Sequence, residues 1–439
     1  MFSNRKPIYL DCNATTPVRP EVQRAMEPYW ENVFGNPSSA HRYGQEAKAA
    51  LELSRQKVAR SLGAKNPDEI VFTSGGTEAN VLGIRGTLGT HDRGYFSVIA
   101  SGAAGATKQS QKGDSFNEIA TTSTELRSRN DKRGHILASP IEHDSIVALL
   151  EQLSGEGYEV EYLGVDQDGR VDPEEVKAKV RADTVLTAVM YANNETGVIE
   201  PIAEIGRFLR ERGILFHVDA VQAAGKIPFS VQDLGATTVA ISGHKIGGPK
   251  GIGALWIDKA TTLSPHHPLA SSPPRPLFPG HQEGGLRAGT QNVAFAVGLG
   301  AALELAVKEL PGFMSHLASL RRSFEEKIAG LIEDARFNGH REFRVANTTH
   351  VSFAGLEGKN LMIALDLEGV LVSTGSACAS GVTKASRVLA AMGLEDKWSR
   401  GSLRFSFGRD TSLEDLDQTA QILAKAVRSQ RKLSVLPSD

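Results

Sequence analysis

The sequence predicts an α/β fold: a large domain with a mostly parallel sheet flanked by helices, plus a smaller α+β domain. Short β-rich runs alternate with segments of helical periodicity, which is typical of a parallel sheet covered on both faces. After Pro311 the order changes to a long helix, short strands and a final helix. With 439 residues, 40% of them hydrophobic, the chain is long enough to bury large cores.

The elements of the large domain follow from their apolar patterns. In residues 202–213, Ile202, Ile205 and Leu209 fall on one face of a helix. Short runs rich in β-branched residues predict buried strands. We therefore expect strands at 69–74, 135–139, 184–192, 214–220 and 237–243, and helices at 77–86 and 202–213.

The smaller domain is predicted from the last third of the chain. Its strands are expected around "THVSFAG" (349–355) and "SLRFSFG" (402–408). Residues 101–134 and 261–279 look inserted, and we expect 101–134 to be a disordered surface insertion because it has no apolar periodicity. The large domain is placed at 16–311, and the small one at 1–15 and 312–439.

Composition excludes several classes of function. The formal net charge is −2, so no basic field favours nucleic acid or an anionic membrane. No run of 18 apolar residues predicts a membrane span, and "MFSNRKPIYLD" does not read as a signal peptide. Two cysteines suit a reducing compartment, so the expected location is the cytoplasm.

Lys245 is the first candidate functional residue. It lies in "SGHKIGGPKG" (242–251), just past a predicted buried strand, between Ser242 and His244. The surrounding glycines let the backbone approach a ligand closely. Most lysines are solvated surface residues, but one desolvated at a strand end can lose its proton and form a Schiff base.

Asp219 gives that lysine a chemical context. It ends the strand at 214–220, where open α/β sheets bind ligands, although a helix N-cap is the alternative. Pyridoxal phosphate (PLP) needs a carboxylate to keep its pyridine nitrogen protonated, so that the ring acts as an electron sink. Gln222 is placed to reach the same ring.

Other polar residues follow neighbouring strands. In "TSGGTEAN", Gly76 and Thr77 begin a helix whose N–H groups suit a phosphate, or are only a cap. His143 in "PIEHDS" could stack on the ring and move protons, although a lone histidine is more often structural. Asn193 follows another strand. Together with the aspartate and the lysine, these strand ends should share one rim of the sheet.

Cys378 sits in "STGSACASG" (373–381), among residues too small to pack over a thiol. An inert buried thiol is the common case for cysteine. It fits poorly here, so a reactive role is favoured. Cys12 follows the β-like "IYLD" and is expected to be structural.

Motifs along nearly the whole chain resemble those of the cysteine desulfurases, a branch of the class V aminotransferases with the PLP-dependent fold-type I architecture. In order, they are "YLDCNATTP", "FGNPSSAHRYG", "IVFTSGGTEAN", "IEHDSI", "NNETGV", "HVDAVQ", "SGHKIGGPKGIGAL", "RAGT", "STGSACAS" and "SLRFSFGR". The resemblance implies conversion of L-cysteine to L-alanine, with the sulfur taken up by Cys378 as a persulfide. The large domain would then be the PLP-binding one, and the small one would carry the cysteine.

The resemblance also implies a role for each matching residue. Lys245 would carry the cofactor, and Asp219 and Gln222 would pair with its ring nitrogen and hydroxyl. His143 would stack on the ring and act as acid and base. The substrate carboxylate would be held by Asn193 and Arg404. The phosphate would be held by Gly76, Thr77, Ser242 and His244, and by Thr290 of the neighbouring subunit in a homodimer.

Three departures from the family concern its partners and loops. Gly284 stands where the family usually has arginine, and 101–134 is longer than the usual connection. The chain ends at "LSVLPSD", without the extended tail that some members use to dock an iron–sulfur scaffold. A sulfur-acceptor protein is expected, for iron–sulfur assembly or tRNA thiolation, and the sequence does not name it. No metal is expected.

Two other readings remain open. Selenocysteine lyase or another class V aminotransferase activity would use the same cofactor, but Cys378 and the full-length loop from it to Arg404 favour desulfuration. A catalytically dead scaffold for sulfur-transfer partners is a different class of function. The presence of Lys245, Asp219 and His143 argues against it.

Overall fold

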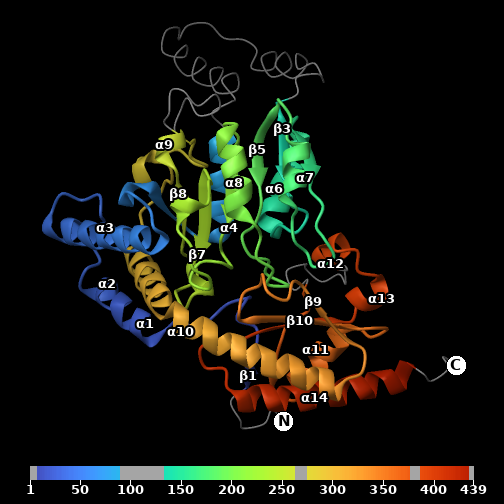
Figure 1. Cartoon of the computed structure of the whole chain (residues 1–439). Helices are drawn as coiled ribbons and strands as arrows, with labels where there is room; N and C mark the ends of the chain where they lie inside the picture. The colour runs from blue at the N-terminus through green and yellow to red at the C-terminus, as the bar shows by residue number, and fades with distance from the viewer. Residues whose placement is uncertain (1–6, 89–132, 263–273, 376–385, 435–439) are drawn as a thin grey trace, which may run out of the picture.

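A seven-stranded mixed sheet underlies the larger part of the molecule (Figure 1). The computed structural model describes residues 7–88, 133–262, 274–375 and 386–434. The strand order is β2-β8-β7-β6-β5-β3-β4, and only β8 runs against its neighbours, so the prediction of a mostly parallel sheet is confirmed. The strands are β2 Ile70–Thr73, β3 His135–Ala138, β4 Glu159–Tyr162, β5 Thr184–Ala188, β6 Leu215–Asp219, β7 Thr238–Ser242 and β8 Gly253–Ile257.

Helices cover both faces of this sheet (Figure 1). Helices α4 (Gly76–Leu88) and α6 (Asp144–Gly155) pack together on one face, and α7 (Pro173–Lys179) and α8 (Ile202–Glu211) on the other. The residues at 202, 205 and 209 are all buried, as the helical spacing predicts. Helix α3 (Arg42–Leu62) packs at the edge near β2, while α1 (Pro20–Met26) and α2 (Pro28–Glu31) pack against the long helix α10 (Val293–Leu331) (Figure 1).

The second sheet has three antiparallel strands in the order β12-β10-β9. Leu403, Phe405 and Phe407 from the β12 segment are buried against Phe324, and Arg404 points to the opposite side. The N-terminal strand β1 pairs with β11 beside this sheet. The elements are β1 Ile8–Tyr9, β9 Ala335–Asn338, β10 Thr348–Phe353, α11 Gly358–Leu367, β11 Val370–Leu371, α12 Arg387–Ala391, α13 Asp396–Ser399, β12 Ser402–Ser406 and α14 Leu413–Ser434.

Helix α10 (Val293–Leu331) links the two sheets (Figure 1). The sequence predicts a long helix after Pro311, and this is wrong at its start, because the helix runs through the proline. Burial on both sides of the interruption, at Leu303 and Leu317, offsets the lost hydrogen bond. Residue 311 lies between two hydrophobic cores, one under each sheet, and the division into domains stays a prediction.

Two sequence predictions concern segments that lie largely outside the described residues. Residues 101–134 lie outside the described residues except for the last two, and most of 261–279 lies outside them as well. Within the described ranges, no helix has both the length and the hydrophobicity that a membrane crossing requires.

Candidate active site

A cleft of about 420 Å³ opens where the parallel strands β3, β5, β6 and β7 end. Its size is within the range of small-molecule sites. The structure brings most of the predicted site residues to its walls, from elements far apart in the sequence. They are Gly76, Thr77, His143, Asp219, Gln222, Ser242, His244, Lys245 and Arg404.

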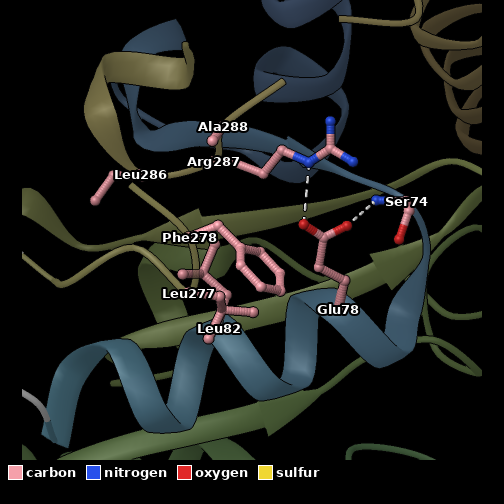
Figure 2. A pocket seen from close by; sticks show the side chains of 8 residues that line it. All are labelled: Ser74, Glu78, Leu82, Leu277, Phe278, Leu286, Arg287 and Ala288. Carbon is pink, nitrogen blue, oxygen red and sulfur yellow. Dashed lines mark hydrogen bonds and ion pairs between the residues drawn. The ribbon is translucent and has the colours of Figure 1, made fainter. Parts of the chain in front are cut away.

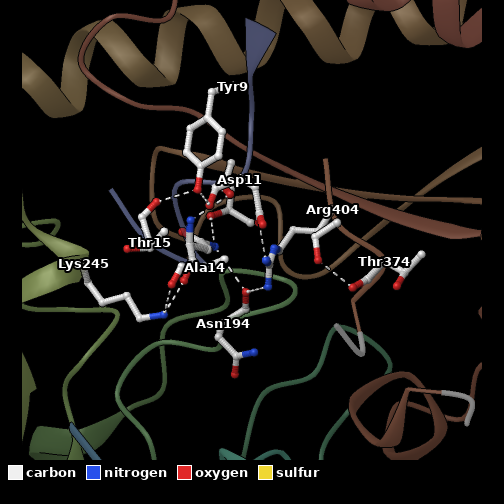
Figure 3. A network of polar contacts seen from close by, with 12 residues as sticks. Tyr9, Asp11, Ala14, Thr15, Asn194, Lys245, Thr374 and Arg404 are labelled. Atoms are coloured by element: carbon white, nitrogen blue, oxygen red, sulfur yellow. Dashed lines mark hydrogen bonds and ion pairs between the residues drawn. The ribbon is translucent and has the colours of Figure 1, made fainter. Parts of the chain in front are cut away.

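Lys245 projects from a short 3-10 turn, Gly243–Lys245, that directly follows β7. Its Nζ donates hydrogen bonds to the backbone carbonyls of Asn13, at 2.6 Å, and Ala14, at 2.9 Å (Figure 3). The turn therefore presents a primary amine to the cleft. The N-terminal segment that holds this amine was not connected with Lys245 from the sequence.

Asp219 is the last residue of β6 and is buried. Its Oδ2 accepts from Asn80 Nδ2 at 2.8 Å, and its Oδ1 accepts from the N–H of Val221 at 2.9 Å. Asn80 is fixed in turn by His217, whose Nε2 lies 3.1 Å from Asn80 Oδ1. A carboxylate held in this way is suited to accept a hydrogen bond from a ring nitrogen.

The start of helix α4 lies directly beside Ser242 in the cleft wall. A side chain at Gly76 would overlap Val221 and lie 3.4 Å from Ser242 Cβ, so only glycine leaves room there. Burial, with the positive charges of Lys245 and Lys250, lowers the pKa of His244 to about 4 and keeps its ring neutral. A helix N-terminus with a hydroxyl group beside it is suited to bind an anion.

Arg404 closes another side of the cleft (Figure 3). Its Nη2 donates to Asp11 Oδ1 at 2.5 Å and its Nη1 to the carbonyl of Asn194 at 3.0 Å. Its Nε is buried without a hydrogen-bond partner among the described residues. Arg404 is only 4% exposed, and its Nε–H remains available to donate to a carboxylate ligand.

Asn193 is a correction to the predicted site. Its side chain is fully buried, with Nδ2 donating to the carbonyl of Ile141 at 3.2 Å and Oδ1 accepting from the N–H groups of Glu195 and Thr196, both at 2.9 Å. It therefore holds a turn and does not line the cleft. The next residue, Asn194, is the one in the wall.

Comparison with known proteins identifies the family. The model of class V aminotransferases matches residues 8–101 and 112–419. The sequence is 40% identical to the cysteine desulfurase IscS of Dictyoglomus turgidum (98% of this chain, 97% of the relative) and 39% identical to that of Methanosarcina thermophila (99% and 95%). The chain belongs to the cysteine desulfurases of the class V aminotransferase family. The resemblance found in the motifs is confirmed.

Solved structures agree with this desulfurase assignment. A NifS-like protein superposes with a TM-score of 0.79 at 33% identity, covering 98% of this chain and 100% of the other. SspA, solved in complex with cysteine, gives 0.70 at 30% identity, covering 91% and 98%. The α/β architecture of this desulfurase is therefore the one expected of PLP-dependent fold-type I.

Sequence reasoning missed a buried network under the cleft of this desulfurase. Asn13 O accepts from Gln222 Nε2 at 2.9 Å as well as from the lysine of the 3-10 turn. Lys226 Nζ donates to Asn13 Oδ1 at 2.9 Å and to Gln222 Oε1. Burial, with the charge of Lys245, lowers the pKa of Lys226 to about 7. The only signal was the quoted motif "YLDCNATTP", which gave Asn13 no role.

The remaining residues singled out in the sequence are Thr290 and the two cysteines. Thr290 is exposed on the segment that precedes α10. Cys378 lies outside the described residues, so its role stays a prediction. Cys12 is buried, as expected of a structural residue, and burial raises the pKa of its thiol to about 12.

Proposed function

We propose that this chain is a PLP-dependent L-cysteine desulfurase that leaves the substrate's sulfur on Cys378 as a persulfide. One observation carries the proposal: Lys245, Asp219 and Arg404 meet in a single cleft, and Gly375 lies in its wall. Cys378 follows that glycine by three residues, so covalent geometry limits their Cα separation to about 11 Å.

The residues of the cleft fit PLP by their chemistry. The buried carboxylate of Asp219, held by Asn80 and a backbone N–H, suits a protonated pyridine nitrogen. The start of α4, beside Ser242 in the cleft wall, suits a phosphate because its first N–H groups have no partner within the helix. When bound, PLP supplies an electron sink for the substrate's α-carbon.

The chain's own residues bind the substrate and move its protons. Arg404 is proposed to hold the carboxylate of L-cysteine, beside Asn194 in the wall. His143 Nδ1 accepts from the N–H of Ser145 at 3.1 Å, which leaves Nε2 to carry the ring proton. His143 and the amine of Lys245 are therefore proposed as the groups that exchange protons with substrate atoms.

Sulfur transfer balances without an outside oxidant. The Cys378 thiolate attacks the sulfur of the substrate, an S–S bond forms and the substrate's C–S bond breaks. The electron pair of that bond stays on carbon, which takes up a proton and becomes the methyl group of alanine. The outer sulfur of the persulfide then passes to a sulfur-acceptor protein, which is the partner we propose.

Arg404→Lys tests the substrate assignment. The wild-type protein with PLP should form L-alanine from L-cysteine, and the variant should raise KM for L-cysteine about tenfold because lysine cannot grip a carboxylate bidentately. Alanine formation against L-cysteine concentration measures both. Arg400→Lys is the matched control, since the side chain of Arg400 is 61% exposed and its ion pair among the described residues, with Asp396, is 3.8 Å long. An unchanged KM in Arg404→Lys would contradict the role.

We further propose a homodimer with shared active sites. Arg55 fixes the base of the "RAGT" segment through a buried pair with Glu283, at 2.7 Å, and Arg287 pairs with Glu78 of α4 at 3.0 Å (Figure 2). The tip with Thr290 is exposed, and Phe278, beside a cavity of about 320 Å³, is 71% exposed. Exposed aromatic surface of this kind suits a protein contact.

Complementation tests the shared site. Lys245→Ala and Thr290→Ala subunits should each be impaired alone. In a mixed dimer, the intact Lys245 of one subunit meets the intact Thr290 of the other, so an exchanged mixture should recover about a quarter of the wild-type activity. No recovery, in a mixture that native mass spectrometry shows to contain mixed dimers, would reject the shared site.

A further inference from the structure

Glu195 is a buried carboxyl group with no role in the proposed reaction. It lies in "NNETG", in the loop after β5, and its side chain reaches the wall of the cleft. It is 7% exposed, and burial raises its pKa, against the opposing effects of a hydrogen bond from Ser386 and the charges of Arg404 and Arg387. Burying a carboxyl group costs free energy unless hydrogen bonds or charges compensate it, so the contacts of Glu195 are worth following.

Ser386, the first described residue after 376–385, is bonded to Glu195. Ser386 Oγ donates to Glu195 Oε2 at 2.6 Å. The same hydroxyl accepts from the N–H of Leu389 at 3.1 Å, as the N-cap of α12. Because the hydroxyl has a single proton and an N–H already points at its lone pair, that proton is directed to the carboxylate. Arg387 Nη2 adds a bond of 2.7 Å to the carbonyl of Glu142.

The last residue before that segment packs on the same carboxylate oxygen. A Cβ at Gly375 would overlap Glu195 Oε2 and would lie 3.0 Å from Nε2 of the buried His350. Two residues earlier, Ser373 exchanges backbone hydrogen bonds with Arg404, the shorter at 2.7 Å. Both ends of the segment therefore meet at one oxygen atom.

Hydrogen bonds hold the loop that carries Glu195 in one conformation. The N–H of Glu195 donates to Asn193 Oδ1 at 2.9 Å, and backbone bonds join Asn193 to Val198, at 2.8 Å, and Gly197 to Asn193, at 3.0 Å. The side chain of Asn193 thus fixes the turn from which the carboxylate projects. Asn193 therefore holds the turn, and Glu195 contacts the segment that ends at Ser386.

We propose that Glu195 is a positioning residue that clasps Gly375 and Ser386 and thereby fixes the spacing between the two ends of the segment that contains Cys378. The inference rests on the proposed function for its chemical meaning, because it assigns Cys378 as the sulfur acceptor. The contacts of Glu195 with Gly375 and Ser386 are independent of that function. Glu195 touches neither reacting atoms nor cofactor in this role, so its loss should affect sulfur transfer more than substrate binding.

Limited trypsin digestion of the PLP-loaded protein tests the clasp. Lys384 precedes Ser386 by two residues, and cleavage after it reports how often this end is released. Glu195→Ala should speed that cleavage about tenfold, because it removes a buried hydrogen bond to a charged group. Glu195→Gln keeps an acceptor oxygen and should stay within about twofold of wild type.

Glu200→Ala is the matched control. Glu200 is a second buried carboxyl group in the same stretch, and its Oε2 accepts from the N–H of Val171 at 2.8 Å, but it touches neither end of the segment. Its loss should destabilise the fold comparably without speeding cleavage after Lys384. Equal acceleration in Glu195→Ala and Glu200→Ala, or none in Glu195→Ala, would overturn the clasp. If Glu195→Ala does not fold, the cleavage rate can be compared between Ser386→Ala, which loses the hydroxyl that donates to Glu195, and Ser386→Thr, which keeps one. Faster cleavage is then expected in Ser386→Ala alone.

A kinetic measurement separates this inference from the proposed function. In Glu195→Ala the kcat for alanine formation should fall about tenfold while KM for L-cysteine stays within about twofold, because Arg404 keeps its hydrogen bonds to Asp11 and Asn194. A wild-type protein that forms no persulfide on Cys378 would defeat the proposed function, yet the trypsin result would still decide the clasp. A larger change in KM than in kcat would contradict the positioning role.

Discussion

Replacing Lys245 by alanine is expected to abolish desulfuration and the visible absorbance of the PLP-loaded protein. The loss of kcat should be at least about a thousandfold, because no other amine has its place in the turn after β7. The fold should persist, since Nζ bonds two backbone carbonyls of a segment held elsewhere by Thr16 and Asn13. Absorbance spectra and alanine formation measure the outcome.

Lys250→Ala is the control for this variant. Lys250 lies five residues on in the same glycine-rich stretch and is exposed, so its loss should leave both readouts unchanged. Borohydride reduction followed by peptide mapping should mark Lys245. A label on Lys250, or on the buried Lys226, would contradict the assignment.

Replacing Cys378 by serine is expected to stop sulfur release and keep cofactor binding. A serine hydroxyl is a far weaker nucleophile toward sulfur than a thiolate, so sulfide formed in the presence of a thiol reductant should fall at least about a hundredfold. The absorbance change on adding L-cysteine should remain, because Arg404 and Asp219 are unaltered. Sulfide release and spectra are the two measurements.

Cys12→Ala is the matched control for the thiol. Cys12 is buried, and its pKa is raised to about 12, so it stays a thiol at neutral pH. Its replacement should keep sulfide release within about twofold of wild type. A loss in Cys12→Ala as large as that in Cys378→Ser would contradict the assignment of sulfur transfer to Cys378 alone.

Much of the cleft could be predicted because its residues follow strands that the sequence marks clearly. His143, Asp219 and Lys245 come directly after short apolar runs, and parallel strands carry their carboxyl ends to one edge. The alternation in "SLRFSFG" likewise predicts which way Arg404 points. Their chemical roles stay predictions, since contacts describe where side chains lie.

The choice between Asn193 and Asn194 shows where local patterns fail. Both follow β5, and spacing from the strand cannot tell which side chain turns inward. The tight turn closed between Asn193 and Val198 decides it, and that turn depends on contacts with β10 residues such as Thr348, which lies against Gly197. A tertiary contact of this range leaves no mark in the motif itself.

Two other features were missed for similar reasons. Helix α10 continues through Pro311 because packing on both sides outweighs a local helix breaker. The clasp at Glu195 joins residues 191 positions apart in the chain, Glu195 and Ser386, so no window of sequence contains it. Buried polar networks between distant segments are read only from the folded chain.

The identity of the sulfur-carrying residue is the central claim, and mass spectrometry tests it most directly. The PLP-loaded protein would be mixed with L-cysteine without reductant, quenched with an alkylating agent and digested. We expect one added sulfur atom on the peptide that contains Cys378, in step with the alanine formed, and none on the peptide that contains Cys12. Alanine formed with no added sulfur on Cys378, or with the sulfur on Cys12, would contradict the account.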